Sequence, residues 1–374
     1  MASKMLQLKK SGIKKDEQSG KISIQSVFRK ILLSEYFVLY LSIAYFLVLT
    51  PFVSNLASME NMGNIISNMW PLFAIAIGQT VVLILAGIDL SQTSILGITS
   101  AIGALIMTTK LDPVLFDKSP LWGWFIGENG GPMANSLAAV PVALLAMLLV
   151  GTLIGILNGV AITKLKMTPF MVTLVSQIFF AALAIYITKS QNVISLPETY
   201  SKIGNGGISF ISYSMLIAIV LAAGAHILLG KSKLGRWLYS TGTNLKASMI
   251  SGVPTDKVVI FAYAFSGFCA AVAAILYSAR LGMGRPTLGA NILMDIIGAT
   301  VIGGTSMFGG KGKVLWTLFG VLFFVLLSNT LNLLNLSYFT INIVKGAVIL
   351  LAALIDVTRT RIMAREVRVE KAGN

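Results

Sequence analysis

The sequence predicts an all-α membrane protein, a polytopic helical bundle with about ten transmembrane helices. Of its 374 residues, 56% are hydrophobic and only 11% are charged, whereas soluble domains carry about 25% charged residues. Apolar stretches of about 18 residues or more recur along the chain, and each can cross a hydrocarbon core about 30 Å thick as a helix. Strands of a membrane barrel would instead give alternating segments of about 10 residues.

The ten predicted spans follow one another with polar connections between them. In chain order they cover about 33–53, 64–86, 91–109, 136–160, 170–188, 208–229, 258–280, 291–308, 314–333 and 339–357. Together they form one membrane domain, 33–357, between a basic N-terminal tail, 1–32, and a basic C-terminal tail, 358–374.

The charge distribution predicts how these spans are oriented. The net charge of +15 comes from 29 Lys and Arg against 14 Asp and Glu. Most basic residues fall in the tails and in the loops on the side of the tails, including a turn-rich segment, 231–257, between the sixth and seventh spans. Because cytoplasmic loops are enriched in Lys and Arg, both termini are predicted to be cytoplasmic. Orientation explains the charge, so no nucleic-acid partner is expected.

Polar residues within the predicted spans are few, and each is costly in lipid. Six are candidates for lining a path through the membrane: Gln79, Asp89, Ser91, Asn158, Asp295 and Asn329. Gly87 can break the second span, and Asp89 or Ser91 can cap the N–H groups that begin the third. A pathway carboxylate and a structural cap both remain open for Asp89. The same two interpretations hold for Asp295, near the start of the eighth span.

Neutral amides also lie within the spans. They are Gln79, Asn158, Gln177, Asn329, Asn332 and Asn342. Hydrogen bonding between helices is their default role, and a hydrated path for a polyhydroxylated solute is the alternative. Lys345 lies inside the last span, where it can pair with a carboxylate or extend its ammonium to the membrane surface; its distance of several residues from either span end favours pairing. The chain lacks the series of carboxylates or histidines that a proton pump needs, so an uncharged solute fits better.

A glycine-rich stretch at 303–312, GGTSMFGGKG, resembles a nucleotide-binding loop only superficially. A Walker A loop has a Gly where Thr305 stands, and a Ser or Thr where Gly312 stands. We therefore expect no nucleotide site and no bound cofactor in this chain. The glycines Gly303, Gly304, Gly309 and Gly310 are expected to permit close helix approach or a helix break. The single cysteine, Cys269, excludes a thiolate metal cluster.

Five blocks of sequence occur in an order and spacing typical of one protein family. They are GQT at 78–80 with GIDLS at 87–91, NG at 158–159 with TPFMVTL at 168–174, GTN at 242–244 with Ala247 and SG at 251–252, Asp295 with the stretch at 303–312, and VKGAVILLA at 344–352 with Asp356. Over about residues 36–358 the chain resembles the permease subunit of bacterial ABC importers for monosaccharides, of the ribose and galactose type.

Five residues, at three places in the chain, depart from that family's usual pattern. Gln92 and Thr93 replace Val-Gly after GIDLS, and Leu293 stands where the family often has Glu. In the segment at 244–247, Leu245 and Lys246 occupy the places of Glu and the first Ala.

The resemblance implies a set of partners in a bacterial inner membrane. Two permease subunits, identical or different, would share one pathway in the lipid. Two cytoplasmic ATPases would use ATP and Mg, and a soluble sugar-binding protein would deliver the solute from outside. The segment 231–257 would carry the coupling helix that contacts the ATPase, with Asn244 as its cap, Ala247 allowing close approach and Gly252 as its end. The coupling residues would be Gly242, Asn244, Leu245, Lys246, Ala247 and Gly252.

Two other functions remain open. Related permeases carry nucleosides or autoinducer-type solutes, and the departures at Gln92, Thr93 and Leu293 leave room for such a solute. An ion-coupled secondary transporter is the alternative from a different class. The scarcity of membrane carboxylates weighs against ion coupling, and no convincing internal repeat supports it.

Overall fold

The computed structural model describes residues 34–208 and 211–354. Both predicted tails, 1–32 and 358–374, lie outside the described residues, as does the end of the tenth span. The described residues from 38 to 354 belong to one compact unit. The arrangement below concerns this unit.

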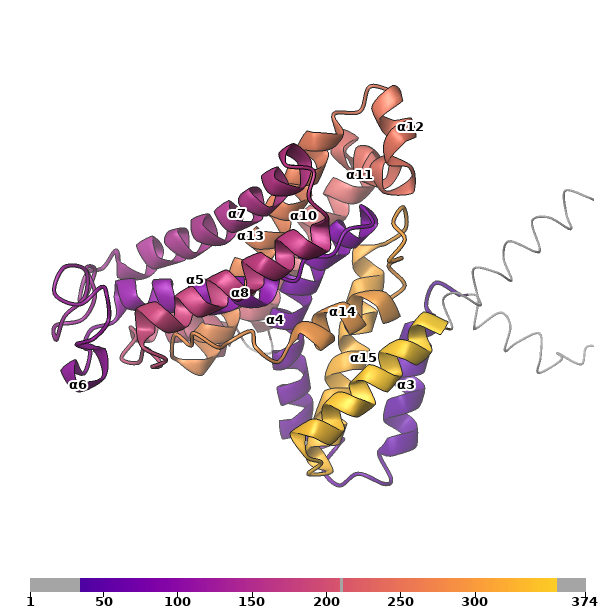
Figure 1. Ribbon diagram of the computed structural model, residues 1–374. Helices are drawn as coiled ribbons and strands as arrows, with labels where there is room; N and C mark the ends of the chain where they lie inside the picture. The colour runs from indigo at the N-terminus through magenta and orange to yellow at the C-terminus, as the bar shows by residue number, and fades with distance from the viewer. Residues whose placement is uncertain (1–33, 209–210, 355–374) are drawn as a thin grey trace, which may run out of the picture. The chain divides into compact units, whose positions relative to one another are not determined.

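The described chain is mainly helical, and an apolar helix lies in each of the ten predicted ranges (Figure 1). The helices are α3 (Phe37–Leu49), α4 (Met59–Ile84), α5 (Gln92–Met107), α7 (Ala139–Lys164), α8 (Pro169–Thr188), α10 (Tyr213–Lys231), α13 (Thr255–Leu281), α14 (Leu293–Ile302), α15 (Val314–Leu333) and an unlabelled C-terminal helix (Tyr338–Leu354). Of these, α4, α7, α8, α10, α13 and α15 are long and apolar enough to cross a membrane. The chain is therefore a multi-pass membrane bundle.

The eighth predicted span, 291–308, is wrong in its last third. Helix α14 ends at Ile302, and residues 303–312 form a loop. Gly304 has a φ of +105°, a conformation that glycine adopts readily and that ends a helix. The glycines that the sequence analysis singled out therefore shorten this helix.

Short elements connect the long helices. They are α6 (Pro113–Phe116), α9 (Glu198–Asn205), α11 (Lys233–Thr243), α12 (Leu245–Ile250) and the strands β1 (Gly207–Ile208) and β2 (Ile211–Ser212). The two strands pair antiparallel, with Gly207 opposite Ser212 and Ile208 opposite Ile211. Helices α11 and α12 occupy the basic segment between α10 and α13.

The centre of the bundle is α13, which packs against α4, α5, α7 and α9. Helices α14 and α15 pack on each other and on α4. In the most apolar part of each helix, 78% of the residues of α4 are buried, against only 22% in α8 and in α10. Apolar side chains that remain exposed over a helix long enough to span a membrane suit contact with lipid. Helices α4 and α13 therefore form the interior, and α8 and α10 form the outer faces.

Glycines allow α7 and α13 to approach closely. Gly151, Gly155 and Gly159 lie four residues apart on α7, and each faces the backbone of α13. A methyl group on Gly151 would lie 2.7 Å from the carbonyl oxygen of Gly267. This is the small-residue packing by which membrane helices gain van der Waals contact, and it fixes the spacing of the central pair.

We predict that Gly155→Ala lowers the thermal stability of the purified protein in detergent. The new methyl group would overlap the carbonyl oxygen of Tyr263, and overpacking of this kind costs about 1–3 kcal/mol. Gly224→Ala is the matched control, because a methyl group there meets open space on α10. Equal melting temperatures for the two variants would show that the α7–α13 contact is not close.

Candidate functional site

The basic segment folds into two short helices with a sharp junction. The Ser232 hydroxyl accepts a hydrogen bond from the Gly235 N–H at 2.9 Å and caps α11. Asn244 has extended backbone angles, and its side-chain oxygen accepts from the Ala247 N–H at 3.0 Å, so it caps α12. Gly252, with a φ of +78°, follows the end of α12. These caps therefore make α12 a helix separate from α11.

One face of α12 is anchored and the other is exposed. Ser248 is buried, and its hydroxyl lies 2.6 Å from that of Ser240 on α11. Around the rest of α12, Leu245, Met249 and Ile250 are 50%, 56% and 88% exposed. Apolar side chains gathered on a small polar loop indicate a protein interaction site. The exposed residues include Lys246 and Ala247 as well.

The glycine-rich loop at 303–312 holds α11 against the end of α4. The Gly310 N–H donates to the carbonyl oxygen of Ile84, the last residue of α4, at 2.8 Å. Gly242 on α11 lies so close to this carbonyl that no side chain would fit there. The Tyr239 hydroxyl donates to the Gly312 carbonyl oxygen at 2.7 Å. We call this contact the glycine clamp; it joins α11 and the loop to the end of α4.

Each glycine of the loop has a structural reason. Gly304, Gly309 and Gly310 have φ values of +105°, +84° and +70°, in the left-handed region that favours glycine. Gly303 packs against the Trp316 carbonyl on α15, and Gly309 packs against the Gly242 carbonyl. The loop therefore serves packing between helices.

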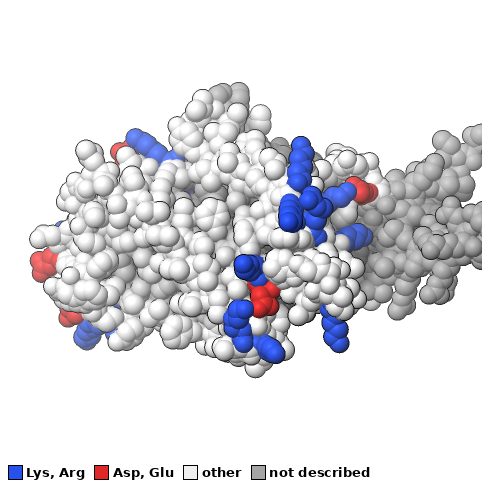
Figure 2. Space-filling model, turned by 90° about the horizontal axis from the view of Figure 1, so that it is seen from above, with Lys and Arg blue, Asp and Glu red and all other residues white. Residues whose placement is uncertain are grey.

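Basic side chains surround α11 and α12. Figure 2 shows Lys and Arg gathered on the side of the molecule where these helices lie. Lys233 lies 4.9 Å from the centroid of the Trp237 ring, and Lys313 lies 4.7 Å from that of Trp316. Lys164 at the end of α7 pairs with Asp256 at the start of α13 at 2.7 Å. A strongly basic surface of this kind suits the cytoplasmic side of a membrane protein.

A buried polar cluster joins α5, α7 and α13, and Asp89 is its centre. One oxygen of its carboxylate accepts from the Ser91 N–H at 3.0 Å and from the Ser91 hydroxyl at 2.6 Å. The other oxygen accepts from the Ser266 hydroxyl at 2.6 Å. The Asn158 amide donates to the Ser91 hydroxyl at 2.8 Å. We call Asp89, Ser91, Asn158 and Ser266 the Asp89 cluster.

The Asp89 cluster is closed within the subunit. Asp89, Ser91 and Asn158 are 1%, 0% and 4% exposed. Asp89 bonds the N–H of Ser91, just before α5 begins, so it stabilises the turn and also connects helices. Gln79 is likewise fully buried, and its amide has no hydrogen-bond partner among the described residues. Four of the six predicted pathway residues therefore face the interior of the subunit.

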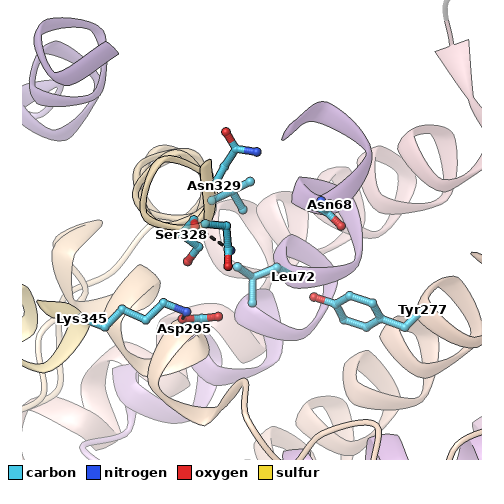
Figure 3. Close-up of a pocket in the computed structure, with 9 residues that line it drawn as sticks. Asn68, Leu72, Tyr277, Asp295, Ser328, Asn329 and Lys345 are labelled. Carbon is cyan, nitrogen blue, oxygen red and sulfur yellow. Dashed lines mark hydrogen bonds and ion pairs between the residues drawn. The ribbon is translucent and has the colours of Figure 1, made fainter. Parts of the chain in front are cut away.

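The remaining two candidates, Asp295 and Asn329, lie together at a pocket (Figure 3). Lys345 on the C-terminal helix forms an ion pair with Asp295 on α14 at 2.7 Å, which confirms the predicted pairing of Lys345 with a carboxylate. Asn329 on α15 and Asn61 on α4 bond each other reciprocally, at 2.9 and 2.7 Å. Asp295 is not the cap of α14, because Ile292 occupies that position.

The sequence analysis missed several partners of these residues. Ser266 and Asn61 are single polar residues in apolar helices, and nothing in their spacing indicates their partners. Tyr277 also lines the pocket, and it looks like one more aromatic residue of a span. Gln177 and Asn342 are half-buried. In the ranges 34–208 and 211–354, His, Cys, Asp and Glu do not gather in the threes or more that a metal site needs.

Comparison with known proteins gives consistent matches over the bundle. A family described as the permease component of branched-chain amino acid transport systems matches residues 61–353. The ribose import permease protein RbsC of Haemophilus influenzae is 33% identical over 303 residues, which cover 80% of this chain and 85% of that protein. RbsC of Bacillus subtilis is 34% identical over 287 residues, 75% of this chain and 80% of that protein.

A more distant relative is the xylose transport system permease protein XylH of Haemophilus influenzae. It is 27% identical over 367 residues, which cover 82% of this chain and 91% of that protein. No solved structure matches the chain. The residues matched to the family run from α4 into the C-terminal helix and contain the glycine clamp, the Asp89 cluster and the pocket. This multi-pass chain therefore belongs to the family of transport-system permease components.

Proposed function

We propose that this chain is the permease subunit of an ABC importer that carries a simple sugar into a bacterial cell. The observation that carries the proposal is α12, a capped helix with an exposed apolar face that the glycine clamp connects to the bundle. Membership of a permease family supports the same function, and so do relatives named for ribose import and xylose transport. In this proposal the chain is a transport subunit and not an enzyme.

In this proposal α12 is the coupling helix. Leu245, Met249 and Ile250 enter a groove of a cytoplasmic ATPase, because burial of their apolar surface favours association. The ATPase binds ATP and Mg, and this chain binds no cofactor. When the ATPase closes, it displaces α12 and α11, and the glycine clamp passes that displacement to α4. The exposed Lys246 adds charge that selects the partner.

The proposed topology has ten membrane crossings with both termini in the cytoplasm of an inner-membrane protein. Ten apolar helices and a basic surface around α11 and α12 support it. A second permease subunit, of the same or a different sequence, completes the pathway within the lipid. An extracytoplasmic sugar-binding protein delivers the solute on the side away from α12.

The burial of Gln92 and Thr93 bears on whether the chain carries a sugar or a nucleoside or autoinducer-type solute. The departures at Gln92 and Thr93 had left the solute open, but both side chains are buried, at 0% and 5% exposure. The Gln92 amide donates to the Ser266 hydroxyl at 2.8 Å, which is a structural role. These two positions therefore do not favour a different solute.

We predict that sugar uptake into vesicles needs all the subunits. The permease is reconstituted with its ATPase on the side of α12 and its binding protein on the other side, and entry of radiolabelled D-ribose or D-xylose is measured with ATP. Omission of the ATPase, ATP or the binding protein should abolish uptake. Uptake by this chain alone, driven by an ion gradient, would instead establish a secondary transporter. Uptake of nucleosides in place of sugars would establish the other solute class.

We predict that exchanging Leu245 and Lys246 for Glu and Ala changes the affinity for the ATPase and not the choice of sugar. Both side chains are exposed on α12, so the double variant should fold normally. A changed charge at a binding surface alters association by about 1 kcal/mol or more, which is about fivefold or more in affinity. Titration with the purified ATPase measures the change. Val114→Glu, on exposed α6, is the control, and unchanged affinity in the double variant would refute the assignment.

We predict that Gly242→Ala uncouples ATP hydrolysis from transport. The new methyl group would collide with the Ile84 carbonyl oxygen, so α11 must move away from α4 while the outer face of α12 stays as it is. Sugar moved per ATP hydrolysed should fall by about tenfold, a typical coupling free energy of about 1–3 kcal/mol. Gly230→Ala, where a methyl group meets open space, should transport normally. Normal coupling in Gly242→Ala would show that the clamp does not transmit movement.

A further inference from the structure

A polar pocket of about 270 Å³ lies where α4, α13, α14, α15 and the C-terminal helix meet (Figure 3). Asn68 on α4 and Asn332 on α15 are exposed at its edge. The Asp295–Lys345 pair lies deeper, with side chains only 14% and 9% exposed. The pocket therefore leads from neutral amides at the surface to a nearly buried ion pair. None of the contacts derived for the glycine clamp or the Asp89 cluster involves it.

The contact between Lys345 and Asp295 uses only some of the hydrogen-bond donors and acceptors of the two side chains. Lys345 has three N–H donors, and Asp295 is the only hydrogen-bonding or ionic partner of its ammonium within the described residues. Apart from this ion pair, the Asp295 carboxylate accepts no hydrogen bond from the described residues. A nearly buried pair gains stability only when its remaining donors and acceptors are satisfied. The pocket therefore presents two free donors and a free acceptor to whatever fills it.

Neutral groups around the pair are also incompletely bonded. The Tyr277 hydroxyl points toward the middle of the pocket (Figure 3) and has no hydrogen-bond partner in the part of the chain that the structure describes. Asn68 uses its oxygen to accept from Arg280 at 2.7 Å, which leaves its NH₂ group available. Asn332 donates to the Ser328 carbonyl at 2.7 Å, which leaves its oxygen available. The pocket is thus lined by both donors and acceptors.

The geometry points to this pocket as a binding site for a neutral polyhydroxylated solute of monosaccharide size. A hydroxyl group both donates and accepts hydrogen bonds, so one solute with several hydroxyls can satisfy the ammonium, the carboxylate, the amides and the phenol together. The volume lies just below the range of about 300–1,000 Å³ for drug-sized ligands, which excludes an oligosaccharide. This inference rests on the proposed function. It assigns a binding site along the transport pathway of the sugar.

The charges of the pocket argue against ionic ligands. An anion attracted by Lys345 would meet the Asp295 carboxylate, and a cation attracted by Asp295 would meet the Lys345 ammonium. The pair is neutral as a whole and already forms an ion pair at 2.7 Å. A charged ligand would have to separate it, and breaking a buried pair is strongly unfavourable. A neutral solute leaves the pair intact and bonds to its free sides.

Tyr277→Phe tests the site by removing one hydroxyl and leaving the ring in place. In vesicles with the ATPase and the binding protein, we expect D-ribose moved per ATP hydrolysed to fall about threefold to tenfold, the effect of one neutral hydrogen bond. Melting temperature in detergent separates this loss from a folding defect. Wild-type transport per ATP in a normally folded Tyr277→Phe would overturn the assignment of this hydroxyl.

A cysteine at Ser328 tests whether the solute passes through the pocket. Cys269 is fully buried, so a maleimide should react only with the introduced thiol. Ser328→Cys must first transport D-ribose, and full labelling should then reduce uptake at least about tenfold, because the reagent fills a pocket of about 270 Å³. Ser54→Cys, on an exposed loop before α4, is the control and should transport after labelling.

Failure of the proposed function and failure of the pocket assignment give different results in these experiments. If the unmodified complex does not import sugar, the proposed function is wrong. If the unmodified complex imports sugar and fully labelled Ser328→Cys still does so at its unlabelled rate, the pocket is not on the route and the inference is wrong.

Discussion

The hydrogen bonds of the Asp89 carboxylate are the interaction on which the centre of this bundle depends. A carboxylate at 1% exposure must have its oxygens satisfied inside the protein, because neither lipid nor water can do so there. Three donors from Ser91 and Ser266 perform this task, and Asn158 bonds the same Ser91 hydroxyl. These bonds therefore fix α5, α7 and α13 relative to the turn that contains Asp89. The glycine contacts between α7 and α13 keep those two helices close enough for the bonds to form.

That turn is also the continuation of the segment that the glycine clamp holds. Ile84 ends α4 and accepts the Gly310 N–H at 2.8 Å, and Asp89 follows five residues later in the chain. A force applied to α11 therefore acts on α4 at the end next to the Asp89 cluster. Such a short connection between an exposed helix and the bundle centre is a physical basis for coupling, because packed helices move as units between discrete arrangements. Apart from the Tyr239 hydroxyl, which donates to the Gly312 carbonyl oxygen, the clamp consists of backbone contacts that depend on glycine.

The sequence predicted the helices well and the polar clusters only in part. Apolar length located each helix, and the position of Lys345 far inside a span indicated a buried carboxylate partner, since an unpaired charge there is costly. It could not decide between Asp89 and Asp295 as that partner, because both carboxylates lie in apolar surroundings. The Asn61–Asn329 pair joins residues 268 positions apart, and no local pattern encodes such a contact. The end of α14 was misplaced because the predicted span extended past Gly303 and Gly304 to the apolar residues Met307 and Phe308.

The Asp89 cluster and the pocket contain similar polar residues, but they differ in how many of their donors and acceptors are bonded within the protein. In the Asp89 cluster, the Ser91 and Ser266 hydroxyls donate to the carboxylate within the subunit, and the Asn158 amide donates to the Ser91 hydroxyl. At the pocket, the Asp295–Lys345 pair and Tyr277 keep unused donors and acceptors around about 270 Å³. Unused buried polar groups lower stability, so a fold that retains them around a cavity is suited to a ligand that completes their bonds. The Asp89 cluster holds the bundle together, and the pocket keeps the polar groups that a passing hydroxylated solute can use.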